Sequence, residues 1–174
     1  KTKTDLSRTT ISMATMAIKA AEQVLGSLHE KNVMLIGASG KIGSVVLKNL
    51  QCIEGARVYI TSRNMQQARE DRHHKISYQI MEYEGRYGLI DDMDVVISAT
   101  SSPHYTLTYE KLAKNLKTSK TRVLVDLAVP IDIEAKTEWL PGVRRYDVDD
   151  FTELARANNE KKQHEVLAAD QILE

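Results

Sequence analysis

Residues 33–43 read Val33-Met34-Leu35-Ile36-Gly37-Ala38-Ser39-Gly40-Lys41-Ile42-Gly43, and a helical pattern follows at once over Ser44–Leu50. A short apolar strand thus runs into a glycine-rich turn that opens an amphipathic helix. Glycines let such a turn adopt conformations that a Cβ forbids, and they let backbone N–H groups approach a pyrophosphate at the helix N-terminus. The stretch predicts a dinucleotide-binding turn formed by Gly37, Ala38, Ser39, Gly40, Lys41, Ile42 and Gly43. The alternative is a strand–turn–helix unit that binds nothing.

Strand-like and helix-like patterns alternate along the rest of the chain. The expected strands are 33–36, 57–61, 76–80, 94–99, 123–127 and a short edge strand at 143–146, with helices at 65–71 and 109–116. This alternation predicts an α/β fold, a Rossmann-like doubly wound parallel sheet. The strand order should reverse between 33–36 and 94–99, so that the turns after these two strands border one crevice.

Two further helices are expected to flank this sheet. Thr9 or Thr10 can cap the first, over residues 11–28. The residues on its apolar face, which should pack on the body, are Ile11, Ala14, Ile18, Ala21, Leu25 and Leu28.

The last helix is expected to begin near Asp149 or Asp150 and to bury Phe151, Leu154 and Ala155. Residues 158–165 are polar all round, and an apolar pattern returns at Val166, Leu167, Ala169, Ile172 and Leu173. Such a helix is expected to leave the body, where its apolar end would either form a dimer contact or be disordered beyond about Lys162. The alternative is a frayed helix on the same body. The chain is thus expected to comprise an N-terminal helical segment (1–30), a dinucleotide-binding domain (31–148) and a connector helix (149–174).

Composition excludes several classes of function. The 24 basic and 24 acidic side chains balance, which argues against nucleic-acid or membrane binding. No apolar run approaches the roughly 20 residues that span a bilayer, and no signal-peptide pattern is visible, so we expect a soluble, cytoplasmic protein. Cys52 is the only cysteine and is expected to be a small buried hydrophobe. His73-His74 lies in a charged loop with no partner ligand in sequence, so no metal site is expected.

The end of the second strand indicates which dinucleotide binds. Folds that select NAD place an Asp or Glu there to hydrogen-bond the ribose hydroxyls. This chain has Ser62, Arg63 and Asn64 instead. A hydroxyl and a guanidinium suit a 2′-phosphate, which predicts NADP(H). The alternative is a surface arginine that caps a loop.

The turn after residues 94–99 should line the nicotinamide end of the crevice. Ala99, Thr100 and Ser101 are small enough to admit the ring, and their hydroxyls and His104 can meet amide or substrate groups. His104 is either a proton donor or a histidine that stabilises the loop. Asp126 is expected to accept backbone N–H groups at a strand end, and Asp132 to cap a helix.

At these residues the chain resembles the NADPH-binding domain of glutamyl-tRNA reductases, over nearly its full length. The blocks that carry the resemblance follow the family's order: Thr2–Arg8 with the Ser12-containing helix, Gly37–Gly43, Ser62–Asn64, Asp94–Thr100 with Pro103-His104, Asp126–Pro130 and Tyr146–Asp150. The last two are the most specific, because few other dinucleotide folds carry both. There are two departures: the glycine turn is one residue longer than the family's, and Ile131 stands where the family has an arginine.

The resemblance implies a division of labour in tetrapyrrole biosynthesis. A cysteine in a separate catalytic domain would attack glutamyl-tRNA to form a thioester, and this domain would bring NADPH to deliver the hydride that releases glutamate-1-semialdehyde. Cys52 is not that cysteine. The partners that the resemblance implies are NADPH, the catalytic and dimerisation domains of the parent protein, and a second copy in a homodimer. Glutamyl-tRNA would contact only the catalytic domain. The chain alone would not catalyse the reaction. Two alternatives remain open: the cofactor domain of a shikimate dehydrogenase-like enzyme, and a non-catalytic nucleotide-sensing module.

Overall fold

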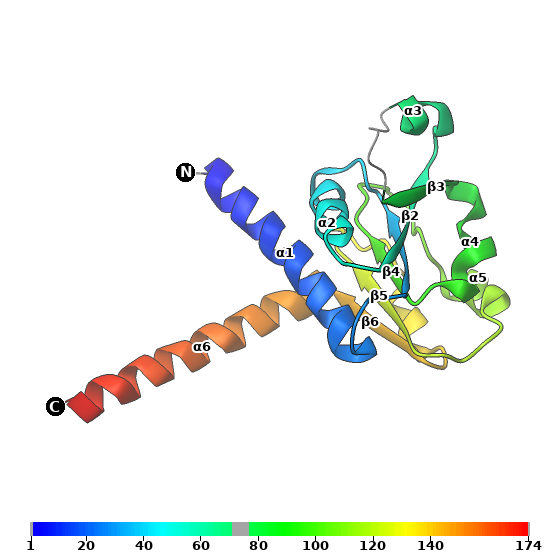
Figure 1. Cartoon of the computed structure of the whole chain (residues 1–174). Helices are drawn as coiled ribbons and strands as arrows, with labels where there is room; N and C mark the ends of the chain where they lie inside the picture. Colours follow the sequence, from blue (N-terminus) through cyan, green and yellow to red (C-terminus); the bar gives the residue numbers. More distant parts are fainter. Residues whose placement is uncertain (1, 71–76, 174) are drawn as a thin grey trace.

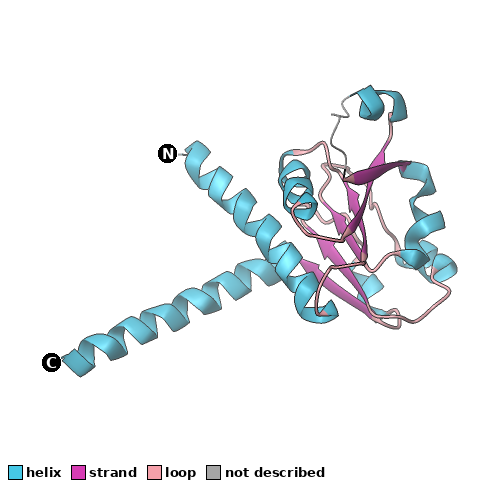
Figure 2. Cartoon of the chain, viewed as in Figure 1, coloured by secondary structure: helices cyan, strands magenta, loops and turns pink. Residues whose placement is uncertain are grey.

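A single parallel sheet forms the centre of the molecule (Figures 1 and 2). The computed structural model describes residues 2–70 and 77–173, and within them the sheet has six strands in the order β3-β2-β1-β4-β5-β6. The strands are β1 (Asn32–Ile36), β2 (Arg57–Ser62), β3 (Tyr78–Glu82), β4 (Val95–Ser98), β5 (Arg122–Asp126) and β6 (Val143–Asp147). The order reverses between β1 and β4, as predicted, and the doubly wound α/β fold is confirmed.

Helices cover both faces of the sheet. The α-helices are α1 (Thr2–Leu25), α2 (Lys41–Gln51), α3 (Met65–Glu70), α4 (Arg86–Leu89), α5 (Tyr109–Asn115) and α6 (Val148–Leu173); the 3₁₀ turns are η1 (Tyr83–Gly85), η2 (Ile90–Asp92) and η3 (Ala135–Trp139). Because successive strand residues point to opposite faces, Val33 and Leu35 join the core cluster that includes α1 residues. Met34 and Ile36 join the cluster that includes Leu112 of α5.

Helix α1 packs against α2 through small side chains. Ala14, Ala17 and Ala21 are fully buried, which lets the two helices approach closely. The expected N-cap at Thr9 or Thr10 is wrong, because the helix already begins at Thr2 and no glycine or proline interrupts it before these threonines. Ile11 is also not on the buried face, since 53% of its surface is exposed.

Helix α6 is anchored at its first turns and then leaves the body (orange to red in Figure 1). Phe151 is fully buried and stacks on Tyr146 of β6, with 6.2 Å between ring centroids. The expectation that Leu154 is buried is wrong, because α6 has already turned it to solvent, with 51% exposed. Side chains 158–171 are all exposed, including Val166 and Leu167, so the long C-terminal helix is confirmed. A dimer contact through it remains a prediction.

A few expectations differ locally from the structure. The helical segment of η1, α4 and η2 was not predicted, and β3 lies about two residues later than expected. Cys52 is exposed at the C-terminal end of α2, so its assignment as a buried hydrophobe is wrong; the helix ends there and the sheet does not cover it. His73 and His74, where no metal site is expected, lie outside the described residues. Within the described ranges no helix is long and apolar enough to cross a membrane.

Candidate functional site

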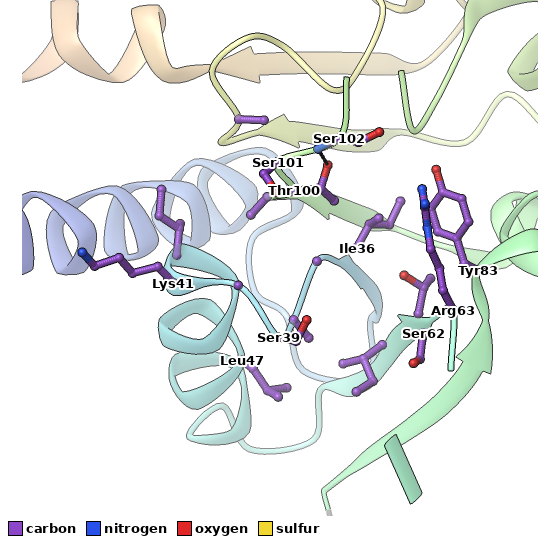
Figure 3. Close-up of a pocket in the computed structure, with 18 of the residues that line it drawn as sticks. Ile36, Ser39, Lys41, Leu47, Ser62, Arg63, Tyr83, Thr100, Ser101 and Ser102 are labelled. Carbon is purple, nitrogen blue, oxygen red and sulfur yellow. Dashed lines mark hydrogen bonds between the residues drawn. The ribbon is translucent and has the colours of Figure 1, made fainter. Parts of the chain in front are cut away.

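A cavity of about 970 Å³ lies at the carboxyl ends of β1, β2, β4 and β5 (Figure 3). Its size falls in the upper part of the range for small-molecule and cofactor sites. Of the residues predicted to bind a dinucleotide, those at 37–42, 62–64 and 99–101 line it, and Gly43 and His104 do not. The structure thus brings together three segments of sequence that lie far apart in the chain.

The glycine turn forms one wall of this cavity. Gly37 has a φ of +91°, and a Cβ on it would lie 2.6 Å from the carbonyl oxygen of Ala99. A Cβ on Gly43 would overlap the peptide carbonyl of Gly37, with its carbon 2.7 Å away. Gly43 therefore acts by letting α2 pack under the turn rather than by touching a ligand.

The N-terminus of α2 has backbone donors available at the cavity wall. Gly40 is its N-cap, no side chain caps the helix, and the first turn carries no acidic residue. The first N–H groups of a helix have no intrahelical acceptor, and the helix dipole favours an anion beside them. Together with the missing Cβ atoms at Gly37 and Gly43, this arrangement fits a pyrophosphate.

The loop after β2 places Arg63 differently from its neighbours. The Ser62 hydroxyl donates to the Asn64 carbonyl and accepts from its N–H, and Asn64 Oδ1 accepts from the N–H of Gln67 to cap α3. Ser62 and Asn64 thus shape the loop. The Arg63 guanidinium lies over the Tyr83 ring, with Cζ 4.5 Å from its centroid. Among the described residues no acceptor is found for its N–H donors, which lie at the cavity wall.

The electrostatic character of the cavity is positive. Among the described residues that line it, Lys41 and Arg63 are charged and none is acidic. The described wall therefore lacks the Asp or Glu that NAD-selective folds place at the end of the second strand, as the sequence indicated.

Asp132 organises the opposite wall. Its buried carboxylate accepts from Ser98 Oγ, Thr100 N and Thr100 Oγ1, each at 2.8 Å. The expectation that Asp132 caps a helix is wrong, since η3 begins after Glu134 and the carboxylate points to the end of β4. Because Thr100 Oγ1 donates to Asp132 and accepts from Ser102 N–H (Figure 3), its proton serves the loop and not a ligand.

His104 lies on the outside of this loop. It is exposed, it does not line the cavity, and its backbone N–H donates to Ser102 Oγ. The hydrogen bond described for His104 is thus one within the loop.

Asp126 holds the next turn, as predicted. Its buried carboxylate accepts backbone N–H groups from Ala128, Asp132 and Ile133 at 2.7–3.0 Å. Burial raises the pKa of Asp126, while these hydrogen bonds act in the opposite direction. Arg145 lies 3.6 Å from the carboxylate and also pairs with Asp147. This network fixes the Leu127–Val129 rim of the cavity.

Comparison with known proteins adds an assignment to this geometry. The sequence pattern of the shikimate / quinate 5-dehydrogenase family matches residues 19–154. The chain belongs to this family. Its relatives include the glutamyl-tRNA reductase of Alkaliphilus metalliredigens, 31% identical over 160 residues, which are 91% of this chain and 37% of that protein.

Solved structures agree with this assignment. The glutamyl-tRNA reductase from Methanopyrus kandleri matches with a TM-score of 0.75 and 28% identity, over 92% of this chain and 41% of that one. The quinate dehydrogenase from Corynebacterium glutamicum in complex with NAD matches with a TM-score of 0.56 and 15% identity, over 81% of this chain and 52% of that one, and shares the fold. The predicted resemblance to glutamyl-tRNA reductases is confirmed, and a nicotinamide cofactor is indicated. The chain spans about two fifths of the length of the reductases it matches.

Sequence reasoning missed two functional features, Tyr83 and the carboxylate of Asp132. Tyr83 comes directly after β3, and ligands in such folds bind at the edge of the sheet where the parallel strands have their carboxyl ends. That position was a usable signal. No comparable sequence signal points to the role of Asp132, because its partners in β4 and the following loop are more than 30 residues away in sequence.

Proposed function

We propose that this chain is the NADP(H)-binding domain of a glutamyl-tRNA reductase-like oxidoreductase, which reduces glutamyl-tRNA to glutamate-1-semialdehyde in tetrapyrrole biosynthesis. The observation that carries the cofactor proposal is the cavity itself, which runs from the uncapped N-terminus of α2 to Arg63 and has no acidic residue among its described lining. The similarity to reductases along nearly the whole chain supports the reaction.

Each wall has a part in this proposal. Residues 37–42 hold the pyrophosphate with backbone N–H groups, and Lys41 adds charge there. Arg63 binds the 2′-phosphate through its planar fork of donors. Residues 99–101 border the nicotinamide, which supplies the hydride when NADPH is bound. Since the reductases are longer, we assign the nucleophilic thiol, the tRNA contacts and dimerisation to other domains of the parent protein.

Calorimetric titration of this chain with NADPH and with NADH tests the cofactor. We expect tighter binding of NADPH, because NADH has no 2′-phosphate for Arg63 to bind. Equal affinities would overturn the choice of NADP(H), and no heat with either cofactor would overturn the dinucleotide site.

A shikimate dehydrogenase-like enzyme is the second candidate, favoured by the description of the family. Both candidates use the same cofactor chemistry, so substrate decides between them. A parent protein that contains this chain should oxidise NADPH with glutamyl-tRNA and should not reduce NADP⁺ with shikimate or quinate. The reverse result would favour the second candidate.

A further inference from the structure

Two guanidinium groups lie over the ring of Tyr83. Arg63, at the end of β2, has its Cζ 4.5 Å from the ring centroid, and Arg86, the first residue of α4, has its Cζ 3.8 Å from the same centroid. Figure 3 shows the Arg63 side chain extending beside the Tyr83 ring at the cavity wall. Tyr83 and Arg63 line the cavity, whereas Arg86 is buried and does not line it.

Neither cation has a carboxylate partner among the described residues. The ion pairs found there involve other side chains. Arg86 is held by neutral groups instead: its Nε donates to the carbonyl of Thr106 at 2.7 Å and its Nη1 to that of Tyr83 at 2.9 Å. Two cations therefore share one ring at the cavity wall, and this excess of positive charge favours an anion there.

Arg86 connects Tyr83 to the sheet. Arg86 binds the backbone of Tyr83, and Thr106, which accepts from Arg86, is joined through its hydroxyl to Ser98 at the end of β4 by a 2.7 Å hydrogen bond. Since Arg86 also lies over the ring, these contacts tie the position of Tyr83 to the end of β4.

Stacking orients an arginine without using up its donors. The face of the guanidinium lies on the ring, and the N–H groups project from its edge toward a phosphate. A long arginine side chain loses rotamer freedom when it binds a ligand, and a contact that already restricts it lowers that cost. We propose that Tyr83 is a positioning residue for cofactor choice: its ring holds Arg63 ready for the ribose 2′-phosphate. This inference rests on the proposed NADP(H) function.

A double-mutant cycle on the 174-residue chain tests the proposal, with NADPH and NADH affinities measured by calorimetry. Tyr83→Leu should weaken NADPH about fivefold, the value of one partly exposed cation–π contact, and leave NADH unchanged. Tyr83→Phe keeps the ring and should bind like the wild type. Tyr109→Leu makes the same change on α5, away from the cavity, and should also have no effect. In the Arg63→Ala background, Tyr83→Leu should cost NADPH nothing more.

The outcomes separate this inference from the proposed function. If the wild type binds both cofactors equally, the NADP(H) proposal fails. If the wild type prefers NADPH and Arg63→Ala abolishes the preference while Tyr83→Leu retains it, only the role of Tyr83 is overturned. An equal loss for both cofactors, or the same loss in the Arg63→Ala background, also overturns it. Tyr83→Met, a second non-aromatic variant, should reproduce the result of Tyr83→Leu, and a wild-type preference in Tyr83→Met would contradict the role of the ring.

Discussion

Gly43 packs directly beneath the peptide carbonyl of Gly37, so closely that a Cβ on Gly43 would lie 2.7 Å from the carbonyl carbon. The first turn of α2 therefore supports the turn that precedes it. The helix can point its uncapped N–H groups into the cavity only because this approach is possible.

Replacing Gly43 by alanine should displace the turn from the helix. Backbone carbonyls cannot move aside as a flexible side chain can, so we expect a loss of about 1–3 kcal/mol in the free energy of unfolding. NADPH affinity should fall as well, because the backbone donors move. Thermal unfolding and calorimetry measure the two effects.

The matched control is Gly88→Ala, since a Cβ on Gly88 meets nothing within 4 Å. This change in α4 should be neutral or slightly stabilising. Equal stability of both variants would contradict the close packing of Gly43.

Arg63→Ala should weaken NADPH about tenfold or more and leave NADH nearly unchanged. A charge-assisted hydrogen bond contributes about 1.5–3 kcal/mol, and NADH lacks the group that would receive it. Arg63→Lys keeps the charge but loses the planar fork, so it should recover only part of the affinity. Titration of each variant with both cofactors checks this, and an Arg63→Ala protein that still prefers NADPH would exclude Arg63 from selection.

Asp91 should make the stability of the fold sensitive to acid. Hydrogen bonds from Thr118 and Lys117 hold the pKa of Asp91 below its usual value of 3.8, with a contribution from Arg122, whose buried Nη2 lies 2.6 Å from the carboxylate. A carboxyl whose pKa is lower in the folded than in the unfolded protein stabilises the fold at pH values above its unfolded-state pKa. This contribution is lost as the pH falls through the folded-state pKa.

Asp91→Asn should therefore lower stability at neutral pH and flatten its decline between about pH 5 and pH 3 relative to the wild type. Urea unfolding across this range measures both. Parallel stability curves for the two proteins would show that the ionised form of Asp91 contributes nothing.

Phe151 should provide most of the attachment of α6. Its ring is fully buried, so Phe151→Ala should cost about 3–5 kcal/mol. Leu154, one turn later, is 51% exposed, and Leu154→Ala should cost far less. Chemical denaturation of both variants compares them, and similar costs would mean that the helix packs more broadly.

The parts of the fold that depend on local sequence were predictable. The turn at Gly37–Gly43 and the apolar strands carry short-range signals, since a glycine turn needs its glycines in order and a strand covered on both faces is continuously apolar. The reversal of strand order then placed Arg63 and Thr100 on one cavity. Sequence alone therefore located most of the candidate site.

Features that depend on distant partners were not predictable in this way. An aspartate followed by 3₁₀ residues has the appearance of a cap, but Asp132 accepts from Ser98 and Thr100 because parallel pairing brings β4 and β5 together. Thr9 and Thr10 are good cap residues, yet a helix that began earlier includes them. Leu154 fits the helical apolar pattern but lies on the face of α6 that is turned to solvent, whereas Ala155 beside it is half-buried.

The anchoring of α6 near one end makes it a lever. From Phe151 to Leu173 a helix rises about 1.5 Å per residue, so its far end lies about 33 Å from the anchor. A tilt of about 10° at the Phe151–Tyr146 stack would carry that end through about 6 Å over this length. By this geometry, a small change in the packing beside β6 would be amplified along the exposed length of α6.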